Sequence, residues 1–222
     1  ALPWSIHTRV TVSVTLLLIV VGPLVVMLFE WTNERTLGEL DFGSKVLASW
    51  LQGVSPRSAG FASVPTAGLR DTTLVVITLL MFIGAGSVST GGGIKVTTFA
   101  LLGAVMWSEV RGQDDTHIFR RRVPVGMTRQ AVTVALLAVG LVAGATIALM
   151  GADSLELLPA MFEITSAFGT TGLSVGVTEH LNTLSSYLVM ALMLMGRVGV
   201  VTFVTAIALS HRSRATSAVR ST

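Results

Sequence analysis

The sequence predicts an all-α membrane protein made of two tandem repeats, each consisting of a helix, a re-entrant loop and a second helix. Apolar residues make up 51% of the 222 residues and charged residues only 12%, whereas an average soluble domain is about 25% charged. The chain has four long apolar stretches, and its second half repeats features of the first. This composition argues against a soluble protein, and a net charge of +3 indicates no nucleic-acid partner.

The four apolar stretches are residues 10–29, 72–107, 131–151 and 184–209. A helix needs about 20 apolar residues to cross a hydrocarbon core about 30 Å thick, so three of the stretches predict single spans. The second stretch, at 36 residues, is longer than one crossing needs, and the glycine cluster "MFIGAGSVSTGGGIK" lies in its middle. We therefore expect the second span to be broken at this cluster.

Between the two spans of each half lies a shorter, half-apolar run, "KVLASWLQGV" in the first half and "LELLPAMFEITSAFG" in the second. Each run is too short to cross the membrane and has the length of a re-entrant or interfacial segment. Small polar residues and glycines follow, in "SPRSAGFASV" and "GTTGLSVGV". We predict a short helix and a pore loop in each half; an extracellular loop with a surface helix is the alternative.

The two halves can be aligned on their glycines. At an offset of 112 residues, Gly60 aligns with Gly172 and Gly84 with Gly196, and no gap is needed across this region. The repeated unit is therefore a span, a short helix, a glycine loop and a span. We divide the chain into residues 1–113, which contain the broken second span, and residues 114–222, which end in a basic tail.

The positions of lysine and arginine predict the orientation of the spans. Arginines cluster in residues 109–129 and after residue 209, and the positive-inside rule assigns these segments to the cytoplasmic side; they could also bind anionic lipid headgroups. Each unit crosses an even number of times, so both units enter the membrane in the same direction and are related by an axis along its normal. This arrangement suits a central pore in a multi-pass protein of the cytoplasmic (inner) membrane.

The glycine loops after the short helices have the properties of an ion filter. Irregular backbone at membrane depth must be buried in protein or line a watery cavity, where its carbonyl oxygens can replace the water around a cation. Glycine permits a positive φ, the end of the short helix adds partial negative charge, and serine and threonine add hydroxyls without bulk. The candidate filter residues are Ser58, Ala59, Gly60 and Phe61 in the first loop and Thr170, Thr171, Gly172, Leu173 and Ser174 in the second.

The segments "SPRSAGFASV", "MFIGAGSVSTGGGIK", "FGTTGLS" and "MLMGRVGVVTF" resemble those of the Trk/Ktr/HKT superfamily of potassium transporters, over nearly the whole chain. The resemblance implies a potassium-channel-like fold with four span–pore–span units in one polypeptide. This chain is similar to the third and fourth units and would form half of a four-repeat pore. Each unit of the family contributes one filter glycine, here Gly60 and Gly172, whose loops would hold the potassium ion.

The resemblance also implies a gate, formed by an intramembrane loop beneath the filter. The gate residues would be Gly84, Gly86, Ser87, Ser89, Thr90, Gly91, Gly92, Gly93 and Lys95, with Arg197 from the last span. A charge in mid-span usually faces a cavity or a partner, so we expect Arg197 just inside the filter; a structural contact to a carbonyl or another chain is the alternative.

Other interpretations of these residues stay open. The glycine cluster could instead form a face for close helix packing, whereas a phosphate-binding loop is excluded because no Gly-Lys pair occurs. Lys95 either positions the gate or marks the return of the chain to the cytoplasmic side. Glu163, inside the second short helix, either bonds backbone behind the filter or faces the outer vestibule.

The expected function is potassium uptake across the cytoplasmic membrane, through a pore-loop filter gated by the glycine-rich loop. The alternative is an ion-coupled secondary transporter, a potassium/sodium or potassium/proton symporter. No paired acids, catalytic triad or metal cluster supports an enzyme. We expect no covalently bound cofactor, with nucleotide acting only through a cytoplasmic nucleotide-binding regulatory subunit. The other expected partners are the lipid bilayer, the missing first half of the pore and a second copy of the chain in a homodimer.

Overall fold

The structure is a computed structural model that describes residues 6–84, 86, 91–112, 117–118, 121–122 and 124–199. Its helices are α1 (Ile6–Glu30), α2 (Phe42–Val54), α3 (Asp71–Phe82), α4 (Val96–Val110), α5 (Val125–Asp153), α6 (Leu157–Gly169) and α7 (Thr183–Val198), with short 3₁₀ turns at Thr66–Gly68 and Thr178–His180. Two strands of two residues each, β1 (His117–Ile118) and β2 (Arg121–Arg122), form the one small sheet of the described residues. The prediction of an all-α fold is confirmed.

Two of the predicted spans are long apolar helices in the structure. Thr8–Glu30 in α1 and Gly126–Asp153 in α5 are long and apolar enough to cross a membrane. The other described helices have 12 to 16 residues, including α7, which begins the last predicted span. Gly199 follows α7 with φ 92°, and residues 200–209 of that predicted span lie outside the described residues.

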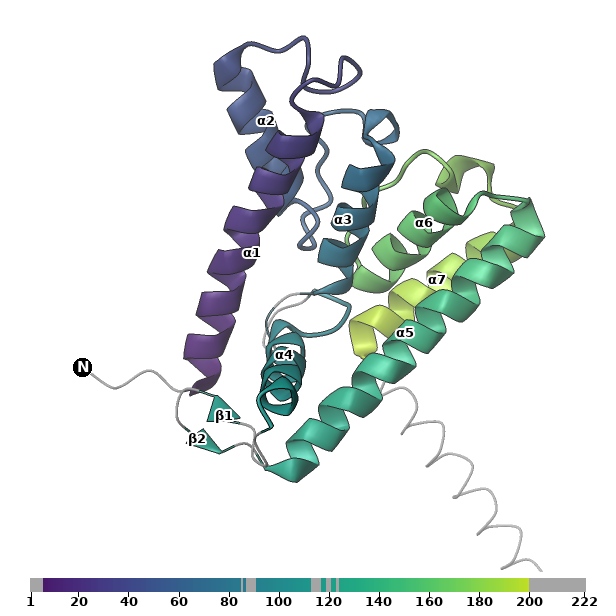
Figure 1. The fold of residues 1–222 in the computed structure, drawn as a ribbon. Coiled ribbons are helices and arrows are strands. Elements are labelled where there is room, and N and C mark those ends of the chain that lie inside the picture. Colours follow the sequence, from purple (N-terminus) through teal and green to yellow (C-terminus); the bar gives the residue numbers. More distant parts are fainter. Residues whose placement is uncertain are drawn as a thin grey trace, which may run out of the picture.

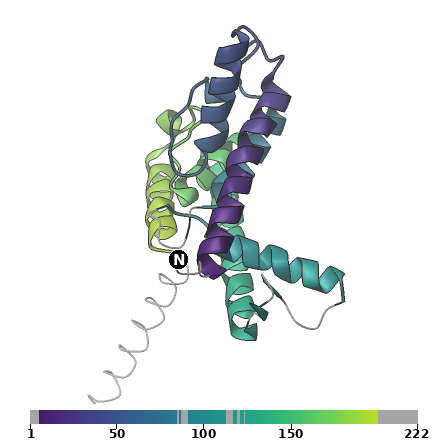
Figure 2. The same ribbon diagram turned by 90° about the vertical axis from the view of Figure 1, so that its left-hand side faces the viewer.

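The second predicted span is broken at its glycine cluster, as expected. Helix α3 ends at Phe82 and α4 begins at Val96. Between them, Ile83 and Ile94 form an isolated parallel bridge, in which the Gly84 N–H donates to the Ile94 carbonyl at 2.8 Å. Helix α4 does not continue α3: Figure 1 views α4 nearly along its axis, and Figure 2 shows it lying across the direction of α1.

The order of a long helix, a short helix and a further helix occurs twice, as α1–α2–α3 and α5–α6–α7. Helix α6 packs against α3, α5 and α7, as Figure 1 shows, and it is buried from Phe162 to its end. Helix α2 packs mainly against α1, where Gly22 and Gly53 bring the two backbones so close that a Cβ on either would overlap the other helix. The two short helices therefore have unequal surroundings.

A buried carboxylate ties the end of α1 to the start of α3. Glu30 has no exposed surface and accepts hydrogen bonds from the side chains of Asn33 (2.5 Å), Thr36 (2.7 Å) and Thr73 and from the backbone N–H of Arg70 (2.9 Å). A buried charge is costly unless it is hydrogen-bonded, and here four donors surround it. This network anchors both ends of the long connection that carries α2 and the first pore loop.

Helix α2 begins at a side-chain cap. Asp41 accepts hydrogen bonds from the backbone N–H groups of Gly43 (3.1 Å) and Ser44 (3.3 Å), which satisfies two donors at the start of the helix. Hydrogen bonds from the side chain and backbone of Ser44 lower the pKa of the Asp41 carboxyl below its ordinary value. The cap sets the point at which the chain turns from the connection after α1 into the first short helix.

Candidate ion filter and gate

The two predicted filter loops meet, although they are far apart in the sequence. A Cβ added to Gly60 would lie 3.6 Å from the Cα of Gly172, and a Cβ added to Gly172 would lie 3.7 Å from the Cα of Gly60. The loops follow the carboxyl ends of α2 and α6, where the partial negative charge of each short helix lies. The structure therefore brings together the two glycines that the sequence alignment pairs.

Both glycines have the positive φ that the sequence analysis predicts, at 72° for Gly60 and 91° for Gly172. At Gly60 there is also no room for a side chain, since a Cβ would lie 2.5 Å from the Thr171 carbonyl oxygen. Ser58 (φ 66°) and Thr170 (φ 51°) adopt the left-handed region as well, at a cost of about 1–2 kcal/mol for each non-glycine residue. Strained backbone of this kind occurs where the surrounding structure holds it.

Hydroxyls of two candidate filter residues hold the loops in place. Thr171 donates to the Pro56 carbonyl at 3.3 Å, and Ser58 donates to the Gly169 carbonyl at 3.4 Å. Each of these hydrogen bonds joins one loop to the other half of the chain. The backbone carbonyls thus become the main candidates for contact with an ion.

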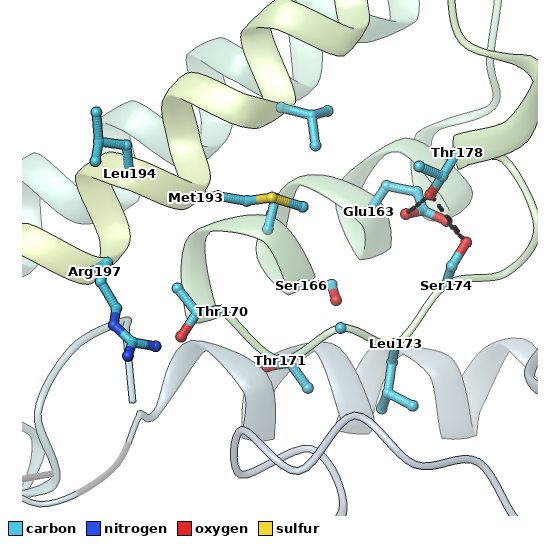
Figure 3. Close-up of a pocket in the computed structure, with 13 residues that line it drawn as sticks. Glu163, Ser166, Thr170, Thr171, Leu173, Ser174, Thr178, Met193, Leu194 and Arg197 are labelled. Carbon is cyan, nitrogen blue, oxygen red and sulfur yellow. Dashed lines mark hydrogen bonds between the residues drawn. The ribbon is translucent and has the colours of Figure 1, made fainter. Parts of the chain in front are cut away.

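A cavity of about 650 Å³ lies between α6, the second filter loop and α7. Figure 3 shows Glu163 at one end, beside Ser174 and Thr178, and Arg197 at the other end, beside Thr170. Thr171 and Gly172 line the cavity between these ends. One wall of the cavity is therefore the second filter loop itself, with an acidic side chain toward one end and a basic side chain toward the other.

The predicted gate loop contacts the base of the second filter loop. The Gly92 N–H donates to the Thr170 hydroxyl at 2.8 Å. A Cβ at Gly92 would lie 2.8 Å from both the Phe168 carbonyl oxygen and the Thr170 methyl group, so only glycine permits this close approach. The predicted gate residues Ser87, Ser89 and Thr90 lie outside the described residues.

The two basic residues of the predicted gate lie near each other. Lys95 donates to the Gly91 carbonyl at 2.6 Å, which closes the end of the glycine loop. Lys95 and Arg197 are close enough to act on each other electrostatically, and Arg197 lines the cavity together with Thr170. Positive charge from two distant parts of the sequence therefore gathers at the end of the cavity where the gate loop lies.

Close glycine contacts enclose the end of α6. A Cβ on Gly196 of α7 would overlap the Phe168 carbonyl oxygen, and a Cβ on Gly169 would lie 2.6 Å from the Met81 carbonyl oxygen of α3. The carboxyl end of this short helix is thus packed directly against α3, α7 and the gate loop. The candidate filter residue Thr170 directly follows this packed helix end.

The sequence analysis did not single out Arg57, which precedes the first filter loop. Its guanidinium donates to the carbonyl of Thr15 at 3.0 Å, in the middle of α1. Arg57 is a charged residue in a segment predicted to be re-entrant. A charge at membrane depth is the signal by which Arg197 was identified, and the same signal could have identified Arg57 from the sequence. Arg57 fixes the first loop against α1.

Comparison with known proteins gives consistent matches. Residues 4–218 match the family model of TrkH, described as a cation transport protein. The chain is 38% identical over 210 residues to the Ktr system potassium uptake protein B of Bacillus subtilis, covering 95% of this chain and 47% of that protein. It is 31% identical to the potassium/sodium uptake protein NtpJ of Enterococcus hirae, covering 90% of this chain and 45% of that protein.

The fold is also similar to a solved structure. The potassium transporter TrkH from Vibrio parahaemolyticus superposes with a TM-score of 0.72 at 16% sequence identity, over 90% of this chain and 43% of that one. The chain spans less than half the length of each of these proteins. The matched family is one of transporters and not of enzymes.

Proposed function

Because the chain belongs to the TrkH family of cation transport proteins, we propose that it supplies two of four span–pore–span units of a potassium pore. Residues 1–113 would be the third unit and residues 114–222 the fourth. The main observation that supports this proposal is the close approach of Gly60 and Gly172. It places the two loops with positive φ side by side. Potassium, the transported substrate, would be held by backbone carbonyls of these loops after it sheds water.

The unequal surroundings of the two short helices support a half ring. Helix α6 is enclosed by α5 and α7 of its own unit and by α3 of the neighbouring unit. By the same arrangement α2 requires a helix from a preceding unit. Its large apolar side chains are exposed here, with Phe42 and Leu47 at 71% and Trp50 at 51%. The proposed first half of the pore would cover them.

The second candidate is a potassium/sodium symporter, because the Enterococcus relative is named for uptake of both ions. Uptake of labelled potassium into vesicles distinguishes a passive pore from a symporter. A passive pore should carry potassium in either direction along its gradient without sodium. Accumulation of potassium against its gradient, driven by inward sodium, would reject passive conduction and support the symporter.

We propose that the glycine-rich loop is the gate and that the Thr170–Gly92 hydrogen bond holds it closed. Replacing Thr170 by valine removes the acceptor, and loss of one such bond is worth about 1 kcal/mol, or roughly a fivefold shift in the closed-to-open ratio. Single-channel recording should therefore show a higher open probability in Thr170→Val. Thr170→Ser, which keeps the hydroxyl, is the control. An open probability equal in both variants and wild type would reject the hydrogen bond as part of the gate.

Arg197 is proposed to raise a barrier to cations below the filter. Removing its positive charge should increase cation flux several-fold, because a unit positive charge beside the ion path repels cations. Flux through the assembled transporter carrying Arg197→Ala measures this, with Arg197→Lys as the variant that retains the charge. If conductance and gating are both unchanged in Arg197→Ala, the proposed barrier does not exist.

The remaining parts of the proposal concern location and partners. We propose a multi-pass arrangement in the cytoplasmic membrane, a homodimer, and a cytoplasmic nucleotide-binding subunit that regulates the gate. The Bacillus subtilis relative is named as one protein of a Ktr system, which favours a further component. Co-purification of a soluble partner and a change of flux on adding nucleotide would support the regulatory subunit; nucleotide-independent flux in the presence of that partner would oppose it.

A further inference from the structure

We infer that Gln52 and Glu163 are equivalent positioning residues, each of which holds the segment that follows the filter glycine (residues 61–63 and 173–178) against the preceding short helix, and that of these two supports only that of Glu163 brings a negative charge. This inference rests on the proposed function, because the loops are taken as the ion filter. It starts from two side chains that lie on the short helices and are almost completely buried, Gln52 with no exposure and Glu163 with 6%.

Gln52 holds the first loop through one residue. Its Oε1 atom accepts from the Ser63 N–H at 3.2 Å and lies 3.5 Å from the Ser63 hydroxyl. The same hydroxyl donates to the Ala48 carbonyl of α2 at 2.9 Å. The segment that follows Gly60 is therefore hydrogen-bonded through Ser63 to α2, the helix that precedes the loop.

Glu163 holds the second loop in the same manner but with more bonds. Its carboxylate accepts from the Val175 N–H at 3.1 Å, from the Thr178 hydroxyl at 2.8 Å and from the Ser174 hydroxyl. Figure 3 shows Glu163 turned toward Ser174 and Thr178, at the edge of the cavity that Gly172 lines. Glu163 therefore bonds the backbone of the segment that follows the loop, as one alternative of the sequence analysis expects, and it also lines the cavity.

The two arrangements occupy corresponding places in the two halves. Gln52 bonds a serine 11 residues later, and so does Glu163. Gln52 precedes Gly60 by 8 residues and Glu163 precedes Gly172 by 9, so the gap-free alignment through the glycines places Glu163 opposite Leu51. The correspondence between Gln52 and Glu163 is therefore visible in their hydrogen bonds, whereas the alignment of the sequence misses it by one residue.

The difference in charge gives the two loops unequal support. A glutamine accepts through one oxygen, whereas a carboxylate has two acceptor oxygens and matches the three donors around it. Hydrogen bonds to an ionised group are roughly twice as strong as neutral ones. Glu163 thus holds its segment more firmly than Gln52 holds the corresponding one, and Glu163 also brings a negative charge to the cavity that the second loop lines.

Potassium/sodium permeability ratios in the assembled transporter test the inference. Glu163→Ala should lower the ratio about tenfold, because the loop loses three bonds, while Glu163→Gln should keep the ratio within about twofold of wild type by keeping an acceptor. Glu163→Gln should nevertheless weaken the apparent affinity for external potassium several-fold, since the negative charge is gone. A purely structural role would reduce the amount of folded protein and leave the ratio unchanged.

A milder pair of variants covers the case in which Glu163→Ala does not fold. Thr178→Val removes one donor at the exposed end of the network and should lower the ratio about threefold. Thr133→Val removes an exposed hydroxyl that donates to the Arg129 carbonyl within α5 and should leave the ratio unchanged. An unchanged ratio in Thr178→Val, or in a folded Glu163→Ala, overturns the positioning role of Glu163. Equal potassium affinity in Glu163→Gln and wild type overturns the role of its charge.

A failure of the proposed function has a different signature. If the wild-type protein passes no potassium, the filter assignment fails whatever the variants do. Amide exchange at Val175 and Ser63 then decides the positioning claim by itself. We expect exchange about tenfold faster at Val175 in Glu163→Gly or Glu163→Ala and at Ser63 in Gln52→Ala; unchanged exchange at these amides would contradict it.

Discussion

Replacing Gly172 by serine is expected to reduce the preference for potassium over sodium about tenfold. Gly172 has φ 91°, and a residue with a Cβ resists this region by about 1–2 kcal/mol, where 1.4 kcal/mol corresponds to a factor of ten. A Cβ would meet only ordinary contact with Gly60, at 3.7 Å. The substitution should therefore turn the loop's carbonyls away from the ion without dismantling the protein.

Bi-ionic permeability measurements on the assembled transporter provide the readout. Gly112→Ser is the control, because Gly112 also has a positive φ, at 63°, and its Cβ would meet nothing within 4 Å. A similar backbone strain is then applied after the end of α4, outside both candidate filter loops. A permeability ratio that is unaltered in Gly172→Ser, or altered equally in both variants, would remove Gly172 from the filter.

Replacing Gly196 by alanine is expected to have the largest effect on stability. The added Cβ would overlap the Phe168 carbonyl oxygen, and that oxygen belongs to the backbone of a buried helix and cannot rotate away. Forcing an extra carbon into such a site costs about 1–3 kcal/mol or more. Because Phe168 lies two residues before Thr170, α7 must move away from α6 or the second filter loop must shift.

Thermal unfolding in detergent and the yield of folded protein measure this effect. Gly103→Ala provides the control, since Gly103 lies inside α4 and a Cβ there would meet nothing within 4 Å. Alanine favours a helix by about 1 kcal/mol over glycine, so the control should be neutral or slightly stabilising. Equal unfolding temperatures for Gly196→Ala and wild type would show that α7 and α6 do not pack as closely as described.

Much of the architecture could be predicted from the sequence because the membrane restricts what a chain can do. Apolar length indicates the spans at α1 and α5, since backbone polar groups in lipid must be satisfied within a helix. The glycine cluster predicted the break between α3 and α4, and the offset of 112 residues predicted that Gly60 and Gly172 are counterparts. Each of these conclusions depends on residue type and spacing along the chain.

The direction of α4 could not be predicted in the same way. Both parts of the broken span are apolar, and the sequence does not tell how the second part is turned. In the structure, the bridge between Ile83 and Ile94, together with Gly93 at φ 74°, turns the chain. Helix α4 then lies across the direction of α1 (Figure 2).

The sequence by itself determined the membrane class, the repeated order of long and short helices and the positions of the glycine loops, because length, composition and local backbone freedom are properties of short segments. Only the tertiary structure decided how the loops are held. Arg57 reaches Thr15 across 42 residues, and Gly92 reaches Thr170 across 78. Such hydrogen bonds depend on where helices bring distant side chains in space, and no spacing within either segment specifies that.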